Sequence, residues 1–147
     1  MTDDAVVLQK PFEVVYAVRL LWYAIVLDIL NTILNWDALL SLLPSDFSFD
    51  KDLFYFFTKV FLVAVVMWLT CKIFLGYNWA RIFFFLGFIL SVPITIPTII
   101  AMFHYSKVFI LISAVITILQ FTGLSLLFSD AGNIWFKAQK GVPKDSF

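Results

Sequence analysis

The residues most able to do chemistry in this chain are a few polar side chains inside long apolar stretches. Asp28 lies well inside an apolar stretch that covers residues 14–36, and Lys59 lies inside the next one. An acid within the hydrocarbon core of a bilayer costs on the order of 2.5–3.5 kcal/mol, so it needs a partner or a purpose. A carboxylate and an amine in such a place can bind a small ion, exchange a proton or form a structural ion pair.

The depths of these two side chains agree if the helices that carry them are antiparallel. We call the side of the membrane away from the chain termini the outer side. Asp28 lies about 11 Å from the outer end of the first span, and Lys59 lies about 9 Å from the outer start of the second. The sequence therefore predicts an Asp28–Lys59 ion pair in the outer leaflet, since each would otherwise be a lone charge in lipid. Alternatively, the long stem of Lys59 lets its amine reach the interface.

Several other polar side chains fall near the same depth. They complete a predicted intramembrane polar layer of Asp28, Asn31, Lys59, Thr98 and Ser113. One interpretation of the layer is a small ion or ligand site or a proton-accepting pair. The interpretation we favour is structural, because hydroxyls and amides hydrogen-bond across membrane helices and fix their register.

Two prolines four residues apart, Pro93 and Pro97, lie in the third apolar stretch. Each lacks a backbone donor and crowds the carbonyl four residues earlier, so we expect a kink that exposes the carbonyls of Ile89 and Pro93. Such carbonyls are tolerated in a membrane only when they are buried in protein or line a cavity. We therefore expect this kinked segment beside the polar layer.

Composition indicates what must position these residues. The 147 residues are 63% hydrophobic and 14% charged, which is too apolar for a soluble domain. The chain is predicted to be all-α, a single integral membrane domain in which four transmembrane helices form an antiparallel bundle. The expected spans are residues 14–35, 53–75, 79–103 and 107–128. Residues 37–44 are too short to cross and are predicted to form a hairpin cap or a short helix in the interface.

The distribution of basic residues predicts the orientation. Seven lie on the side that holds both termini: Lys10, Arg19, Lys72, Arg81, Lys137, Lys140 and Lys144. The other side has three, namely Lys51, Lys59 and Lys107, with several acids around them. Both termini are therefore expected in the cytoplasm. Arg19, which lies inside the first span, is expected to reach lipid phosphates with its long side chain.

The turn between the second and third spans carries a recognisable pattern, Gly76-Tyr-Asn-Trp-Ala-Arg81. Tyr77 and Trp79 suit the membrane interface, Asn78 can cap the third span, and Arg81 can hold lipid phosphates or the carbonyls that end the second span. The pattern resembles the G-x-N-W-A-R turn of small four-span bacterial inner-membrane proteins, a family without an assigned activity. The run from Pro11 through Val14, Ala17 and Leu20 and the later Trp135-Phe136-Lys137 resemble further elements of that family. The resemblance implies a bacterial cytoplasmic membrane with both ends of the chain inside; the last element is expected to be an interfacial anchor.

The sequence holds no set of side chains typical of an enzyme. The single cysteine and single histidine disfavour a metal centre, no cofactor is expected, and zero net charge gives no reason to expect nucleic-acid binding. Besides the lipid bilayer, the expected partner is another membrane protein or a second copy of the chain. We expect a non-enzymatic role in binding another membrane component, as an immunity-type protein or an accessory or regulatory subunit. The alternative is a small oligomeric channel or transporter that uses the Asp28–Lys59 layer.

Overall fold

The computed structural model describes residues 9–43, 50–103 and 105–139, and every regular element in these ranges is a helix. The order along the chain is α1 (Phe12–Leu34), α2 (Trp36–Ser41), α3 (Lys51–Phe74), α4 (Asn78–Met102), α5 (Lys107–Leu127) and α6 (Asp130–Ala138). Four of them, α1, α3, α4 and α5, are long and apolar enough to cross a membrane. Each predicted span is thus confirmed as a helix, with ends within two residues of the expected ones.

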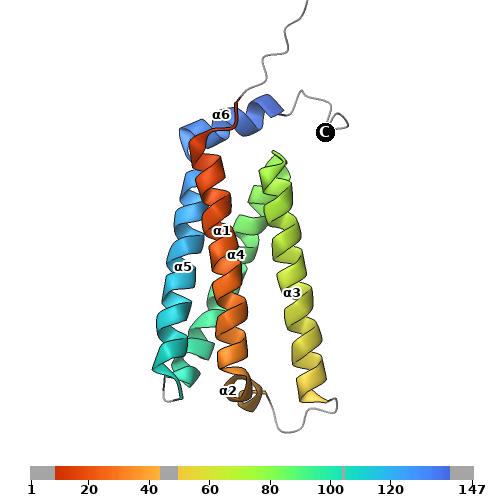
Figure 1. Cartoon of the computed structure of the whole chain (residues 1–147), viewed down its shortest axis with the longest axis vertical. Helices are drawn as coiled ribbons and strands as arrows, with labels where there is room; N and C mark the ends of the chain where they lie inside the picture. Colours follow the sequence, from red (N-terminus) through yellow and green to blue (C-terminus); the bar gives the residue numbers. More distant parts are fainter. Residues whose placement is uncertain (1–8, 44–49, 104, 140–147) are drawn as a thin grey trace, which may run out of the picture.

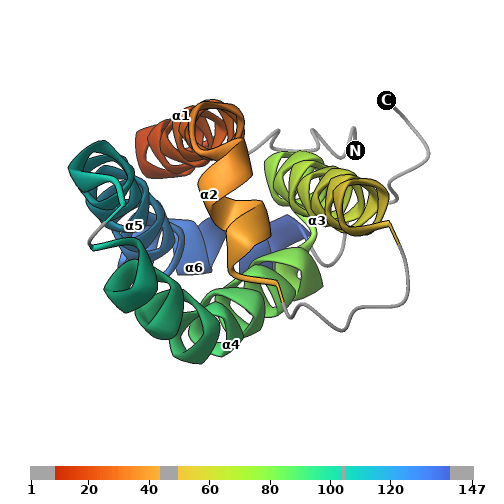
Figure 2. The same ribbon diagram turned by 90° about the horizontal axis from the view of Figure 1, so that it is seen from below.

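The four long helices form a ring in which chain neighbours run in opposite directions (Figure 1). Viewed along the bundle, the order around the ring is α1, α5, α4 and α3 (Figure 2). The short α2 crosses one end of the ring, as predicted for residues 37–44, and α6 crosses the other. These two ends are called the α2 end and the α6 end below. The outer side of the prediction corresponds to the α2 end.

Local sequence signals set where the helices begin and end. The Asp50 carboxylate accepts hydrogen bonds from the amides of Asp52 and Leu53 at the start of α3, and the Ser106 hydroxyl accepts one from Phe109 at the start of α5. Gly76, between α3 and α4, has a φ of +83°, a conformation that favours glycine over other residues. The middle of the connector before α3, residues 44–49, lies outside the described residues.

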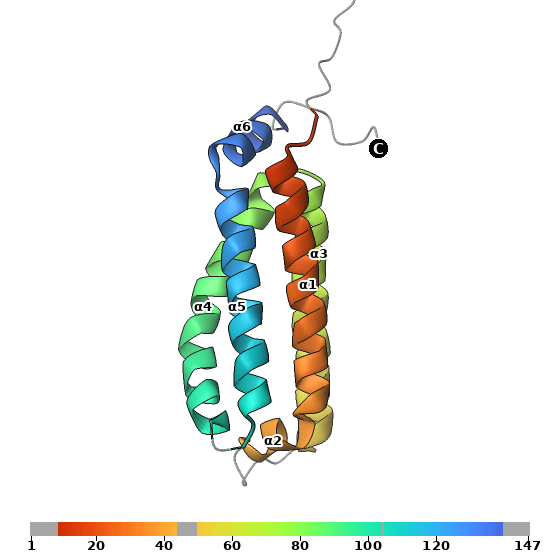
Figure 3. The same ribbon diagram turned by 60° about the vertical axis from the view of Figure 1, so that its left-hand side comes forward.

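The bundle is packed most tightly between α1 and α5, the first and last spans, which run side by side (Figure 3). Gly123 of α5 allows this approach, because a Cβ atom there would lie 3.1 Å from the Leu21 side chain and 3.3 Å from the Ala17 carbonyl oxygen. In contrast, α3 buries only Thr70 and Ile73, both near the α6 end. The helices α3 and α4 are therefore less embedded in the bundle than α1.

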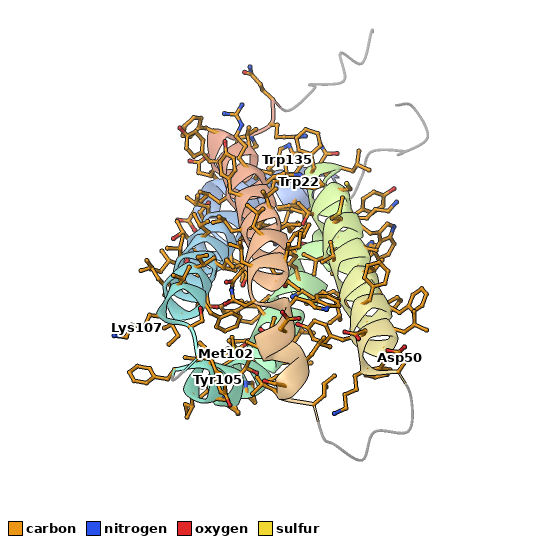
Figure 4. The ribbon with its side chains drawn as sticks, turned by 60° about the horizontal axis from the view of Figure 1, so that its bottom comes forward. Trp22, Asp50, Met102, Tyr105, Lys107 and Trp135 are labelled. Atoms are coloured by element: carbon orange, nitrogen blue, oxygen red, sulfur yellow. The ribbon has the colours of Figure 1, made fainter. Side chains whose placement is uncertain are left out.

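Two apolar clusters hold the ends of the ring together. The cluster at the α6 end joins α1, α3, α4, α5 and α6 through side chains that include Leu21, Ile73, Leu127 and Phe136. The smaller cluster at the α2 end joins Leu39, Met102 and Phe109. Trp135 and Met102 mark the two positions in Figure 4. The residues of the predicted polar layer lie on the long helices, between these two clusters.

Candidate functional site

Asp28 of α1 and Lys59 of α3 form an ion pair, as the sequence predicts. The Lys59 Nζ atom lies 2.9 Å from Oδ2 and 3.0 Å from Oδ1 of Asp28, so one ammonium group contacts both carboxylate oxygens. The side chains are 38% exposed for Asp28 and 26% exposed for Lys59. The pair therefore neutralises two charges inside apolar helices while remaining partly open to its surroundings.

The next turn of α1 connects to α5 instead of α3. The Asn31 side-chain amide donates a hydrogen bond of 3.1 Å to the Ser113 hydroxyl, and both side chains are buried. Asn35, whose part in the site the sequence did not suggest, donates from its own amide to the Asn31 carbonyl at 2.9 Å and to Asn31 Oδ1 at 3.2 Å. The sequence signal for this contact was the spacing of four residues between Asn31 and Asn35, which places the two side chains next to each other on a helix. Asp28 and Asn31 thus tie α1 to α3 and α5 respectively.

Thr98 does not belong to this layer, and that part of the prediction is wrong. Its hydroxyl donates to the Ile94 carbonyl oxygen of its own helix at 3.0 Å. The physical reason is packing: none of the α4 residues between Phe84 and Met102 is buried, so the middle of α4 does not press against α1. A residue can lie at the right depth along one helix and still be out of reach of the others.

The two prolines lie on the same unpacked part of α4. The helix continues through Pro93 and Pro97, and its axis changes direction along its length (Figure 3). Both prolines are exposed, as is Ile89. The expectation that this segment would be buried beside the polar layer is therefore wrong for the single chain.

An aromatic and acidic group formed by Trp36, Asp52 and Tyr55 lies near the α2 end. The Trp36 indole donates to Asp52 Oδ1 at 3.4 Å, and its ring lies 5.2 Å from that of Tyr55 in an edge-on arrangement. Tyr55 also packs against the cluster at the α2 end. The sequence did not suggest this contact, because it depends on how α2 folds back over the start of α3.

The turn between α3 and α4 differs from the prediction at Asn78. Asn78 is the first residue of α4, and its side chain does not cap the helix; Oδ1 accepts a hydrogen bond of 2.7 Å from Arg81 Nε instead. Tyr77 occupies the cap position, and Trp79 is 38% exposed with its ring 5.4 Å from that of Trp68. Tyr77 and Trp79 are therefore at the end of the bundle where an interface would lie.

Arg81 is buried in the protein and does not reach out to lipid phosphates. It is 6% exposed, and its Nη1 donates to the Leu127 carbonyl oxygen at 2.8 Å. The carbonyl belongs to the end of α5, the fourth span, and not to the second span as expected. The guanidinium also lies 4.5 Å from the Phe136 ring and 4.9 Å from the Phe128 ring. A cation at the carbonyl end of a helix is favourable because that end carries partial negative charge.

The segment after α5 is part of the core. Trp135 and Phe136, expected as interfacial anchors, are 3% and 0% exposed. The indole Nε1 of Trp135 is buried and has no hydrogen-bond partner among the residues that the structure describes. The helix is interrupted at residues 128–129, and α6 then lies across the end of the bundle (Figure 1).

These contacts define what the polar layer can do. Both oxygens of Asp28 are occupied by Lys59, so a cation or proton must compete with an ammonium group for the carboxylate. Within the described ranges, no three His, Cys, Asp or Glu side chains are grouped so as to hold a metal ion. The geometry favours a structural link between α1, α3 and α5. No family model, curated protein or solved structure matches the chain.

Proposed function

We propose that this protein works by binding another membrane protein along α4, without a catalytic step. It would serve as an immunity-type protein or as an accessory or regulatory subunit in a bacterial cytoplasmic membrane. The proposal rests on one observation: α4 buries residues only at its two ends, at Ala80, Arg81 and Phe84 and again at Met102. The exposed face of this helix between its ends, which includes Leu90 and Ile94, is available to a partner helix.

The chemistry of the exposed part of α4 supports a protein partner over lipid alone. Pro93 and Pro97 lack the amide hydrogens that would bond to the carbonyls of Ile89 and Pro93. Lipid cannot donate hydrogen bonds to such carbonyls, whereas a polar side chain of a neighbouring helix can. Gly87 adds a shallow place for close approach, since a Cβ atom there would meet nothing within 4 Å.

The charges at the two ends support the proposed orientation. The described basic residues at the α6 end are Lys10, Arg19, Lys72, Arg81 and Lys137. The α2 end has Lys51, Lys59 and Lys107, of which Lys59 is neutralised by Asp28. An excess of basic residues marks the cytoplasmic side of bacterial membrane proteins. The α6 end, and with it both termini, is therefore proposed to face the cytoplasm.

A photo-crosslinking experiment in intact cells tests the proposed partner face. A photoreactive amino acid replaces Leu90 or Ile94 on α4, and Leu111 or Ile118 on α5 serves as the matched position, since all four are strongly exposed. We expect discrete protein adducts from α4 only, and their loss when Gly87→Leu fills the shallow site. Equal adducts from both helices, or none from α4, would contradict the proposal.

A second candidate function, a small oligomeric channel or transporter, is favoured by the partial exposure of the Asp28–Lys59 pair. A charge pair that is not sealed in the core can exchange its carboxylate contact for a passing ion or proton. Flux into proteoliposomes distinguishes the two candidates. This alternative requires a flux that Asp28→Asn abolishes and that Asp37→Asn, an exposed acid of α2, leaves unchanged. No flux with either the wild type or the variants would rule it out.

A further inference from the structure

A hollow of about 500 Å³ lies against the start of α1, away from the polar layer. Its apolar lining includes Phe12 and Val15, and its polar lining includes Lys10, Tyr16 and Arg19. The lining comes from the last residues of the N-terminal arm and the first two turns of a membrane-spanning helix. A site of this kind offers both hydrogen-bond donors and apolar surface at one end of the bundle.

The two cations of the hollow have no acidic partner in the part of the chain that the structure describes. Arg19 is exposed and has no hydrogen bond or ion pair among these residues. Lys10 donates to the Phe74 carbonyl oxygen at 2.8 Å, and its Nζ lies 3.2 Å from the centre of the Phe74 ring. Neither contact cancels the charge of Lys10. Glu13, the acid of the first turn, is not among the residues that line the hollow.

The depth of Arg19 makes its lack of a partner informative. It lies about 10 Å along the helix from Phe12, within the apolar span. A guanidinium there must reach the interface or receive an anion, because a lone charge in the hydrocarbon core is costly. Partial burial also lowers the pKa of Lys10, a cost that a nearby anion would relieve.

We propose that this hollow binds an anionic lipid, with the head-group phosphate between Lys10 and Arg19 and an acyl chain along Phe12 and Val15. Arginine suits phosphate because its planar donors match the phosphate oxygens. A lipid fits better than free phosphate because it also covers the apolar lining, and an anionic lipid fits better than a zwitterionic one because the lining carries two positively charged side chains. The ring of Tyr16 lies 4.2 Å from that of Phe12 between ring centres, in a tilted arrangement, and its phenol lies where an interfacial tyrosine suits a head group.

Native mass spectrometry of the full-length protein in mild detergent tests this site. Phosphatidylglycerol and phosphatidylcholine are added in equal amounts, and retained lipid is measured. We expect wild type to retain phosphatidylglycerol preferentially, and Lys10→Gln/Arg19→Gln to lower that retention about tenfold. Lys107→Gln, which removes an exposed cation at the α2 end (Figure 4), is the matched control and should retain phosphatidylglycerol as wild type does.

Two further measurements keep the result decisive. Arg19→Lys keeps the charge and should retain most of the lipid even if the double variant folds poorly. Inorganic phosphate at millimolar concentration should not displace phosphatidylglycerol; displacement would show that the hollow takes free phosphate, which contradicts the proposal. Equal retention of the two lipids by wild type, or an equal loss in the Lys107→Gln control, would also overturn it.

Discussion

Lys59 of α3 places its ammonium group 2.9 Å and 3.0 Å from the two carboxylate oxygens of Asp28, so that α1 and α3 are joined by charge where few side chains pack between them. The two residues are 31 positions apart in the chain. The contact matters because α3 buries only Thr70 and Ile73, both far from the pair. Away from the α6 end, the ion pair is the principal polar link that keeps α3 against α1.

The two partners of this pair should differ in the cost of their removal. Lys59→Met leaves Asp28 without its partner inside an apolar helix, and its side chain is too short to extend far along that helix, so the variant should lower the free energy of unfolding by about 2–3 kcal/mol. Asp28→Asn leaves Lys59, whose stem can reach the interface, and should cost about 1 kcal/mol. The double variant should be more stable than Lys59→Met alone. Unfolding in mixed detergent micelles measures all three, and identical stabilities of the single variants and wild type would contradict the assignment.

The buried link between Asn31 and Ser113 predicts a smaller effect. Ser113→Ala removes the acceptor of a 3.1 Å hydrogen bond between α1 and α5 and should cost about 0.5–1.5 kcal/mol. Ser91→Ala is the matched control, because the Ser91 hydroxyl is exposed and donates only to the Phe88 carbonyl of its own helix. The same unfolding assay should find the control unchanged. Equal losses in the two variants would mean that the inter-helix bond contributes nothing.

Two glycines in membrane-spanning helices should respond in opposite ways to the same substitution. Gly123→Leu places a side chain where even a Cβ atom meets Leu21 and the Ala17 carbonyl, and it should separate α1 from α5 and prevent stable folding. Gly87→Leu points into open space and should leave the thermal unfolding temperature of the purified protein within a few degrees of wild type. A large loss of stability in Gly87→Leu would show that α4 packs differently.

Arg81 should be needed for the corner at which α5 ends and α6 begins. Arg81→Met removes the hydrogen bonds to Asn78 and Leu127 and should cost about 2 kcal/mol. It should also speed trypsin cleavage after Lys137 in α6, since α6 is held partly by the contact between Arg81 and Phe136. Lys107→Met, an exposed cation at the other end, should change neither the stability nor the cleavage rate.

Lys10 predicts a pH dependence at alkaline pH. Its pKa in the folded protein is lowered by burial from the ordinary value of 10.5. Between the lowered pKa and 10.5, the unfolded chain binds more protons than the folded one, so stability should rise with pH across that window. Thermal unfolding in detergent free of anionic lipid, measured across this pH range, gives the difference in stability between wild type and Lys10→Gln. A difference that falls with rising pH would contradict the predicted sign.

The sequence was sufficient to predict the four spans and the Asp28–Lys59 pair because both depend on position along a helix. Apolar length fixes each span, and a charge inside a span has few possible partners at the same depth. Asn31 and Ser113 followed from the same argument. These features need no knowledge of which helices touch.

The remaining features depend on which faces of the helices meet, and depth alone cannot supply that. Thr98 has the expected depth but lies on a helix whose middle holds no fully buried residue, and it bonds to its own backbone. Arg81 lies near a helix end, as expected, but it donates a hydrogen bond to a carbonyl at the end of α5. Only the fold of the whole chain brings that helix end near Arg81. Trp135 and Phe136 have the composition of an interfacial anchor, and the return of α6 across the bundle buries them.

The pairing of the first span with the last has a consequence for how the protein is made. During synthesis α1 enters the membrane long before α5 exists. Asn31 must wait for 82 further residues to be made before Ser113, its hydrogen-bond partner, is present. Asp28 finds Lys59 much earlier, after 31 further residues. The nascent chain must therefore hold Asn31 and the small-residue surface around Ala17 without their final partners until α5 arrives. A chain interrupted between α4 and α5 would expose the most tightly packing surface of the protein to the translocation machinery or to other nascent helices.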